Sequence, residues 1–338
     1  MPRRRALGKG AGREPSPRCQ AESPFWFARC SFCEAHLNPS AAAFDSLAPD
    51  SRVSFPCDGA FILLVRWDQG VGSIMDNRPI GVFDSGVGGL SIWRAIRRLL
   101  PQESLIFFAD SGHVPYGEKS TDELHDLTGR VARFLLSQDA KIIVVACNTA
   151  TVHAIGYLRE TFPETPFVGV VPVVKTLARR TRTGTIAVLS TPATAQSPYL
   201  AGLIREFAPD KRVINVGCDG LENMVEAGEV GTRATTALLE RHLESVRGSE
   251  ADVVGLGCTH YPFLRGRIKR MLGEGVRLFD PSRPVARRTR EVLRARDALA
   301  ENARPQHRFY TTGDAGVFGR VASRLLRRPV REVEHVEI

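Results

Sequence analysis

The chain has 338 residues, of which 43% are hydrophobic and 25% are charged, and its formal net charge is +9. This composition is ordinary for a soluble globular protein, and the length suits two domains of roughly 100–200 residues each. The basic residues form only short clusters without interleaved aromatic residues, so no direct nucleic-acid binding is expected. No run approaches the ~20 apolar residues of a membrane span, so no membrane association is expected either.

The seven cysteines argue against a disulfide framework, because their number is odd and three of them are scattered widely through the part with regular patterning. The first 30 residues also lack the continuous apolar region of a signal peptide. Together these features predict a cytoplasmic protein whose thiols stay reduced.

Residues 1–74 show no sustained helical or strand period, and regular patterning begins just after Met75. Our hypothesis is that Met75 is the natural start and that residues 1–74 are a non-conforming, disordered extension. The alternative is a regulatory or targeting segment, and the intact mass of the native protein distinguishes the two. Cys30 and Cys33 have the spacing of half a zinc site, but no second pair follows at a suitable distance, so no metal is expected.

From Pro79 onward, short apolar runs alternate with amphipathic stretches. The predicted strands are 80–83, 105–108, 141–145, 185–189, 212–216 and 252–256, and the predicted helices are 90–100, 121–137, 198–207 and 234–247. Continuous β-branched runs separated by helices are typical of a parallel sheet covered on both faces.

The two halves of this region match each other. The first strand of each half ends in small polar residues at Asp84 and Ser190, and the third is followed by a cysteine, Cys147 or Cys258. We interpret this as an internal duplication. It predicts an α/β protein of two pseudo-symmetric, doubly wound parallel-sheet domains. Ligands of such sheets bind outside the carboxyl ends of the strands, so the active site is expected in the cleft between the domains.

Two cysteines in equivalent positions suit proton transfer at a stereocentre, which needs a base on one face of the carbon and an acid on the other. A helix that begins directly after Cys147 is expected to lower the pKa of its thiol. A redox dithiol and a nucleophile with a separate base are the alternatives. The first usually requires a Cys-x-x-Cys loop, and the second needs only one cysteine.

Asp84 and His260 are candidates for tuning the two thiols. The glycines after Ser85 permit close approach of the backbone and offer N–H groups to an anion. Ser91 stands where a dinucleotide fingerprint has its third glycine, so the loop predicts a carboxylate pocket. Glu226 lies in a helical stretch after Cys218, which is interpreted as structural.

These motifs resemble those of the glutamate racemases over roughly residues 78–330. The resemblance rests on Ile80-Gly-Val-Phe-Asp-Ser-Gly-Val-Gly-Gly-Leu-Ser91, Val114-Pro-Tyr-Gly117, Ala146-Cys-Asn-Thr-Ala150, Gly257-Cys-Thr-His-Tyr-Pro-Phe263 and Phe309-Tyr-Thr-Thr-Gly-Asp314. Gly-Cys-Thr-His-Tyr-Pro is the most specific of them.

The resemblance implies that Cys147 removes the α-proton of D-glutamate and that Cys258 removes that of L-glutamate. Asp84 would assist Cys147, and His260 with Glu226 would assist Cys258. The substrate-binding residues implied are Asp84, Ser85, Pro115, Tyr116, Gly117, Asn148, Thr149, Thr194, Thr259 and His260.

The resemblance further implies no pyridoxal phosphate or other cofactor, no metal, and a role in supplying D-glutamate for peptidoglycan. It implies a homodimer and a cell-wall precursor as a potential activator. It places the C-terminal segment on the first domain, so the expected domains are 75–171 with 282–338, and 172–281. The alternatives are an aspartate or broad-specificity racemase, which His260-Tyr261-Pro262 disfavours, and a protein that binds DNA gyrase.

Overall fold

A computed structural model describes residues 52–57, 60–65, 76–170 and 173–338. The chain divides into two units, residues 1–72 and residues 73–338. In the first unit, β1 (Arg52–Cys57) pairs with β2 (Ala60–Val65) in antiparallel orientation, a hairpin that is not expected from the sequence. Met75 and the Cys30–Cys33 pair lie outside the described residues.

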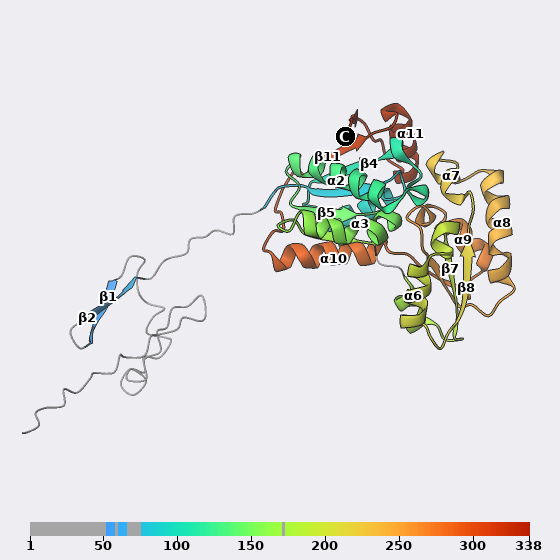
Figure 1. The fold of residues 1–338 in the computed structure, drawn as a ribbon, viewed down its shortest axis with the longest axis horizontal. Helices are drawn as coiled ribbons and strands as arrows, with labels where there is room; N and C mark the ends of the chain where they lie inside the picture. The colour runs from blue at the N-terminus through green and yellow to red at the C-terminus, as the bar shows by residue number, and fades with distance from the viewer. Residues whose placement is uncertain (1–51, 58–59, 66–75, 171–172) are drawn as a thin grey trace, which may run out of the picture. The chain divides into compact units, whose positions relative to one another are not determined.

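The second unit contains two parallel sheets (Figure 1). The larger sheet has the order β12-β11-β4-β3-β5-β6, and the smaller has the order β10-β9-β7-β8. The strands of the larger sheet are β3 (Ile80–Asp84), β4 (Leu105–Ala109), β5 (Ile142–Val145), β6 (Phe167–Gly169), β11 (His307–Thr311) and β12 (Val333–His335). Those of the smaller sheet are β7 (Thr185–Ser190), β8 (Arg212–Gly217), β9 (Val253–Leu256) and β10 (Arg277–Phe279).

The strand orders support the internal duplication. The order β4-β3-β5-β6 in the larger sheet is repeated as β8-β7-β9-β10 in the smaller one. The larger sheet is extended on one side, where β11 pairs with β4 so that His307 lies opposite Leu105. The parallel α/β fold class is thus confirmed, while the domain boundaries near residues 171 and 281 stay a prediction.

The six strands and four helices expected from the sequence are all present, with each end within one residue of its predicted place. The longer helices are α1 (Leu90–Leu99), α2 (Thr121–Ser137), α3 (Asn148–Thr161), α6 (Pro198–Phe207), α8 (Arg233–Arg247), α9 (Arg265–Leu272), α10 (Ser282–Ala295) and α11 (Ala315–Leu326). The shorter ones are α4 (Val174–Arg180), α5 (Pro192–Ala195), α7 (Leu221–Glu226) and the 3-10 turns η2 (Ser111–His113), η3 (Tyr116–Glu118) and η4 (Tyr261–Phe263).

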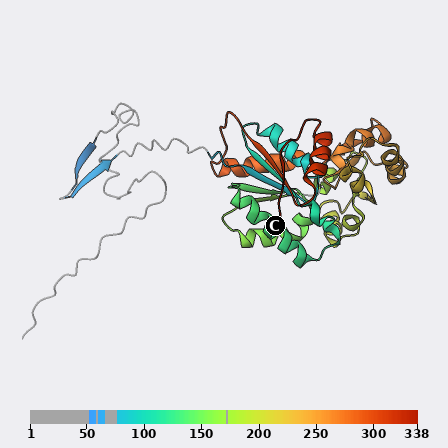
Figure 2. The ribbon, with the colours of Figure 1, turned by 90° about the horizontal axis from the view of Figure 1, so that it is seen from above.

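Helices cover both faces of the larger sheet, as Figure 2 shows for α10 on one side and α2 and α3 on the other. Successive side chains of a strand point to opposite faces. In β3, Val82 therefore packs in the cluster that includes α1, α10 and α11, whereas Phe83 packs with α2 and α3. With both faces buried, the strands contain continuous apolar runs, which is why they could be recognised from the sequence.

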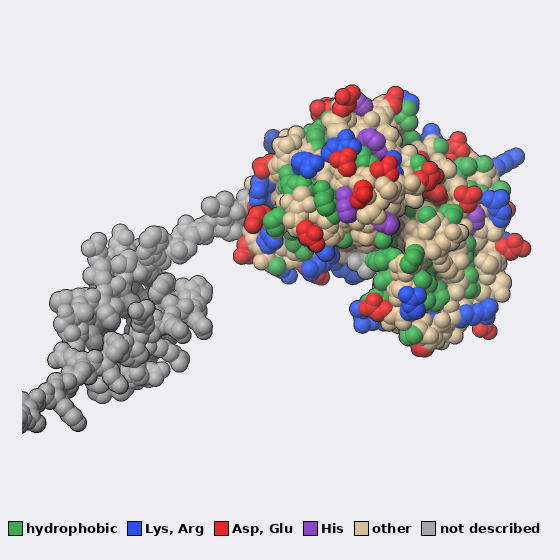
Figure 3. Space-filling model, viewed as in Figure 1, with side chains coloured by type: hydrophobic (Ala, Val, Ile, Leu, Met, Phe, Trp, Pro, Cys, Tyr) green, Lys and Arg blue, Asp and Glu red, His purple; other side chains and the backbone are tan. Residues whose placement is uncertain are grey.

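No helix among the described residues is long and apolar enough to cross a bilayer. On the face drawn in Figure 3, basic and acidic side chains are interspersed over the second unit.

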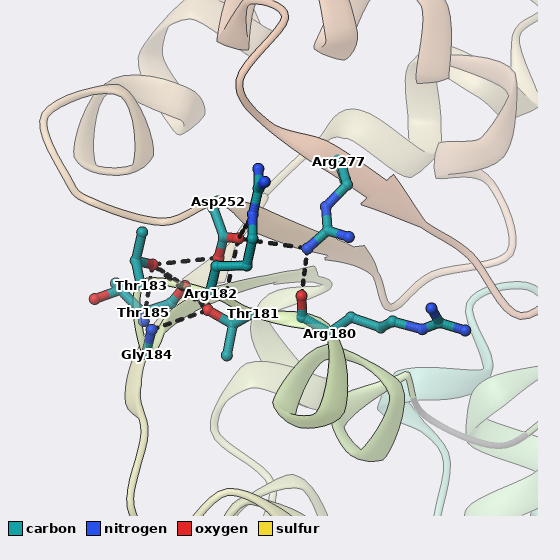
Figure 4. Close-up of polar contacts among 8 residues, drawn as sticks. All are labelled: Arg180, Thr181, Arg182, Thr183, Gly184, Thr185, Asp252 and Arg277. Atoms are coloured by element: carbon teal, nitrogen blue, oxygen red, sulfur yellow. Dashed lines mark hydrogen bonds and ion pairs between the residues drawn. The ribbon is translucent and has the colours of Figure 1, made fainter.

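A polar cluster around Asp252 fixes the start of β9, the strand that leads to Cys258 (Figure 4). Its carboxylate accepts hydrogen bonds from Thr181 Oγ1 at 2.6 Å, the backbone N–H of Arg182 at 2.9 Å and Thr183 Oγ1 at 3.2 Å. Arg277 donates to this carboxylate at 3.4 Å and also to the carbonyl of Arg180. Burial raises the pKa of the Asp252 carboxyl, but these hydrogen bonds outweigh burial and hold the pKa below its ordinary value.

We expect Asp252→Ala to lower the free energy of unfolding by about 2 kcal/mol at neutral pH, because several donors lose a shared acceptor. Because the folded-state pKa is depressed, this contribution should be lost as the pH falls through it. Urea unfolding at neutral and acidic pH measures both effects. Asp210→Ala, which removes an exposed carboxylate paired only with Lys211, is the control and should change stability little. Equal losses in the two variants would contradict the structural role of Asp252.

Candidate active site

The carboxyl ends of the strands of both sheets meet at one place. Asp84 ends β3, Cys147 lies two residues after the end of β5, and Cys258 lies two residues after the end of β9. Asn148 Nδ2 donates to the carbonyl of Gly257 at 2.7 Å, joining the residue after one cysteine to the residue before the other. The structure thus brings together the two motifs that the duplication predicted.

Cys147 is the N-cap residue of α3, and its side chain is buried. Its sulfur lies 3.8 Å from Ser85 Oγ. Burial and the nearby charge of Asp84 raise the pKa of the Cys147 thiol to about 12, although hydrogen bonds with Ala150 and Ser85 oppose the rise. The helix start does act to lower this pKa, through the N–H of Ala150, as the sequence predicted. The expected net decrease is nevertheless wrong, because desolvation of the thiolate and the charge of Asp84 outweigh it.

Asp84 is 1% exposed. Its carboxylate accepts hydrogen bonds from the N–H groups of Ser85 at 2.9 Å and Gly89 at 2.5 Å, and from Thr259 Oγ1 at 3.4 Å. Burial raises the pKa of Asp84 to about 6, since the charge of His260 and the hydrogen bonds only partly offset the desolvation and the repulsion from Glu226. Asp84 can therefore exchange a proton near neutral pH.

Cys258 is paired with an imidazole. Its sulfur lies 3.3 Å from His260 Nδ1, and His260 Nε2 lies 2.6 Å from Glu226 Oε1. Burial acts to lower the pKa of His260, but the interactions with Cys258 and Glu226 together outweigh burial and raise the pKa well above its ordinary value. The His260 imidazolium can therefore donate a charge-assisted hydrogen bond to the Cys258 sulfur.

The glycine-rich turn lies against these groups. Glu226 Oε1 also accepts the N–H of Val87 at 2.9 Å, so one carboxylate from α7 joins His260 to the turn. A Cβ at Gly86 would lie 2.0 Å from Glu226 Oε1, and one at Gly88 would lie 2.4 Å from Thr259 Oγ1. The turn does offer N–H groups to carboxylates, as the sequence predicted, but in this structure three of those N–H groups bind the protein's own Asp84 and Glu226.

The loop before α2 is organised by Asp110, which the sequence analysis did not assign to the site. This fully buried carboxylate accepts hydrogen bonds from Tyr116 Oη at 2.5 Å, Thr312 Oγ1 at 2.7 Å and His113 Nδ1 at 2.7 Å. Burial, together with the charge of Asp110, raises the pKa of Tyr116 well above its ordinary value, so Tyr116 stays a neutral donor. Pro115 and Gly117, two other predicted residues of this loop, are exposed.

A cavity of about 80 Å³ lies beside the cysteines and is lined by four of the predicted substrate-binding residues, Gly117, Asn148, Thr149 and Thr194. Most of the remaining lining is apolar, and neither cysteine is part of it.

Ser190, which the sequence analysis named only as a strand end, also lines this cavity. Its hydroxyl is buried and has no hydrogen-bond partner among the described residues. The signal in the sequence is its equivalence to Asp84, since each residue ends the first strand of its half.

A model of the Asp/Glu/hydantoin racemase family matches residues 80–289. The glutamate racemase of Pseudomonas putida is 45% identical over 236 residues, which cover 70% of this chain and 89% of the relative. The crystal structure of glutamate racemase isoform RacE1 from Bacillus anthracis is similar with a TM-score of 0.70 and 33% identity, covering 78% of this chain and 98% of that one. Escherichia coli glutamate racemase, solved with L-glutamate and the activator UDP-MurNAc-Ala, has a TM-score of 0.69 and 32% identity, covering 77% and 98%.

Two buried serines of the site provide a matched comparison. Ser91 Oγ donates to the carbonyl of Thr259 at 3.0 Å, whereas Ser190 Oγ has no partner among the described residues. We expect Ser91→Ala to lower the free energy of unfolding by about 1 kcal/mol, because it leaves the buried carbonyl unpaired. Ser190→Ala should leave the free energy unchanged or raise it. Urea unfolding measures both, and a larger loss from Ser190→Ala would show that its hydroxyl is bonded in the folded protein.

Proposed function

The chain belongs to the Asp/Glu/hydantoin racemase family and is a glutamate racemase, and on this premise we propose that it inverts glutamate by moving the α-proton between Cys147 and Cys258. One observation carries the proposal. Each cysteine follows the equivalent strand of its half, and each has a titratable partner, Asp84 for Cys147 and His260 for Cys258.

Inversion needs one thiolate and one thiol at the same time. The cation of His260, held by Glu226, lies beside the sulfur of Cys258 and suits Cys258 to act as the base, whereas the raised pKa of Cys147 keeps that residue protonated. In this state Cys258 removes the α-proton of L-glutamate and Cys147 protonates the opposite face. For D-glutamate the roles reverse, and Asp84 takes part in removing the proton from Cys147.

The substrate is proposed to bind between the two cysteines. The N–H and hydroxyl groups of Ser85, Asn148, Thr149 and Thr259 would hold its carboxylates, with Pro115, Tyr116, Gly117 and Thr194 forming the wall toward the cavity. Fixed donors of this kind stabilise the negative charge that develops on the carboxylate as the α-proton leaves. The reaction would then require neither pyridoxal phosphate nor a metal.

The product is proposed to supply D-glutamate for peptidoglycan. Because the E. coli relative was solved with UDP-MurNAc-Ala, activation by such a cell-wall precursor is also proposed for this chain. A homodimer is proposed as the working state.

The test is to incubate the full chain with L-glutamate in D₂O, with EDTA and without pyridoxal phosphate, with and without the precursor. We expect D-glutamate that carries α-deuterium. Cys147→Ala and Cys258→Ala should each abolish inversion, because either change removes the acid or the base from one face. Cys218→Ala is the matched control, since Cys218 is also buried and follows β8, and it should keep its activity.

Inversion that survives the loss of either Cys147 or Cys258 would refute the two-thiol mechanism. Faster inversion of aspartate than of glutamate would refute glutamate as the preferred substrate. Absence of both inversion and deuterium exchange in the unaltered protein, even with the precursor, would refute racemase activity for this chain.

The raised pKa of Asp84 predicts a pH dependence of activity. The rate of D-glutamate conversion should fall as the pH drops through about 6, because Asp84 becomes protonated and cannot assist Cys147. Asp84→Asn should lose this step in the pH profile and be slower by roughly 10²–10⁴-fold. The surface variant Asp210→Asn should keep the profile of the unaltered protein.

The raised pKa of Asp84 has the opposite effect on the free energy of unfolding, which should decrease as the pH rises. The folded protein binds a proton at Asp84 more tightly than the unfolded chain does, so stability should fall as the pH rises from about 4 to about 6. Urea unfolding of the unaltered protein and of Asp84→Asn across this range measures the effect. An identical pH dependence in both proteins would contradict the raised pKa.

A further inference from the structure

A second polar cluster lies at the amino ends of the strands of the larger sheet, whereas the cysteines lie at the carboxyl ends of the strands. It contains Arg97 in the last turn of α1, His307 at the start of β11 and Arg328 just after α11. β11 runs from His307 to Thr311, whose neighbour Thr312 bonds to Asp110 at the active-site edge. A strand of five residues separates its two ends by roughly 15 Å, so the cluster is distinct from the racemase site.

The cluster is packed against an aromatic ring. Arg97 Nε donates to His307 Nε2 at 3.1 Å. The ring of Trp93 stands edge-on to His307 with centroids 5.2 Å apart, and the guanidinium of Arg97 lies 5.9 Å from the Trp93 ring. Trp93 itself is 1% exposed. These contacts fix the orientation of the imidazole and of one guanidinium.

Three donors of this cluster are buried without an acceptor among the described residues. Because His307 Nε2 accepts from Arg97, the neutral ring carries its proton on Nδ1, whose contact with the backbone of Gln306 falls short of hydrogen-bond geometry. Arg328 Nη1 and Trp93 Nε1 are also buried and unpartnered. Buried hydrogen-bond donors normally have acceptors, since a buried donor without an acceptor lowers the stability of the folded protein.

The charges of the cluster also indicate a site for an anion. Burial, with the charges of Arg97 and Arg328, lowers the pKa of His307 to about 4. Burial and the charges of Arg328 and Arg98 also lower the pKa of Arg97. Neither Arg97 nor Arg328 forms an ion pair within the described residues. A basic residue in the last turn of a helix is favourable by itself, but this does not explain why two guanidinium groups and an imidazole gather without a carboxylate.

We propose that Arg97, His307 and Arg328 form an anion-binding site for a phosphate group, beside Trp93. A guanidinium presents planar pairs of N–H donors that match the oxygens of phosphate, and a neutral imidazole adds one N–H. The phosphate could be free or carried by a larger molecule. The site does not depend on the racemase activity of the chain.

The test uses fluorescence of the full chain with Trp26→Phe and Trp67→Phe, which leaves Trp93 as its single tryptophan. Sodium phosphate is titrated at constant ionic strength with chloride, in the presence of saturating glutamate so that the racemase site is occupied. Adenosine monophosphate is titrated in a parallel arm. We expect a saturable change in Trp93 emission, and tighter binding of the nucleotide than of free phosphate would indicate that the phosphate belongs to a larger ligand.

Arg97→Gln and Arg328→Gln should each weaken binding at least about tenfold, because a charge-assisted hydrogen bond is lost. Arg328→Lys, which keeps the charge without the planar fork, should weaken binding less. Arg212→Gln on β8 is the matched control, because Arg212 is an exposed arginine of the other sheet. Racemisation by each variant verifies that it is folded.

The proposal is overturned if phosphate and the nucleotide both give no saturable change. It is also overturned if binding is equal in the Arg97→Gln, Arg328→Gln and Arg212→Gln variants.

Discussion

The site depends on hydrogen bonds between backbone N–H groups of one short turn and two carboxylates. Val87 N–H binds Glu226, and the N–H groups of Ser85 and Gly89 bind Asp84. Glu226 belongs to α7, in the part of the chain that contains the smaller sheet, so its bond to Val87 links the partners of both cysteines. This arrangement requires glycine at position 86, because a Cβ there would overlap the Glu226 carboxylate. The orientation of His260, and through it the charge beside Cys258, follows from this contact.

Two groups of the site lower the stability of the folded protein at neutral pH. Asp84 is buried where its carboxylate is disfavoured, and Ser190 has a buried hydroxyl without a partner among the described residues. The buried ion pair of Lys141 and Glu103, by contrast, is satisfied. Lys141 Nζ lies 2.7 Å from Glu103 Oε2 and donates to the carbonyls of Asp76 and Ala298, while Glu103 accepts the N–H of Ala300. Unmet polar groups are typical of sites that bind a ligand, and the contrast between these two regions supports the assignment of the site.

The strands and the pairing of the cysteines could be predicted because they depend on local patterns. Continuous apolar runs such as Ile142–Val145 indicate a strand covered on both faces, and the repeat of polar residues after such runs indicates the edge where ligands bind. The pKa of Cys147 could not be predicted, because it depends on how deeply the thiol is buried by distant segments. The role of Asp110 was missed for the same reason, since its partner Thr312 lies 202 residues further along the chain. Thr312 also accepts the N–H of Gly112, in the same loop as Asp110. The partnerless hydroxyl of Ser190 likewise emerges only from tertiary packing.

The duplication repeats the backbone but not the chemistry of the two halves. Asp84 ends β3, whereas the equivalent residue at the end of β7 is Ser190. His260 follows Cys258 by two positions, whereas Thr149 stands at the equivalent position after Cys147. One thiol therefore lies near an anion and the other beside a cation, so the two sulfurs have different electrostatic surroundings. Two identical halves would give both sulfurs the same surroundings. The proposed proton transfer, which runs in either direction between the two sulfurs, depends on this difference between two equivalent strand ends.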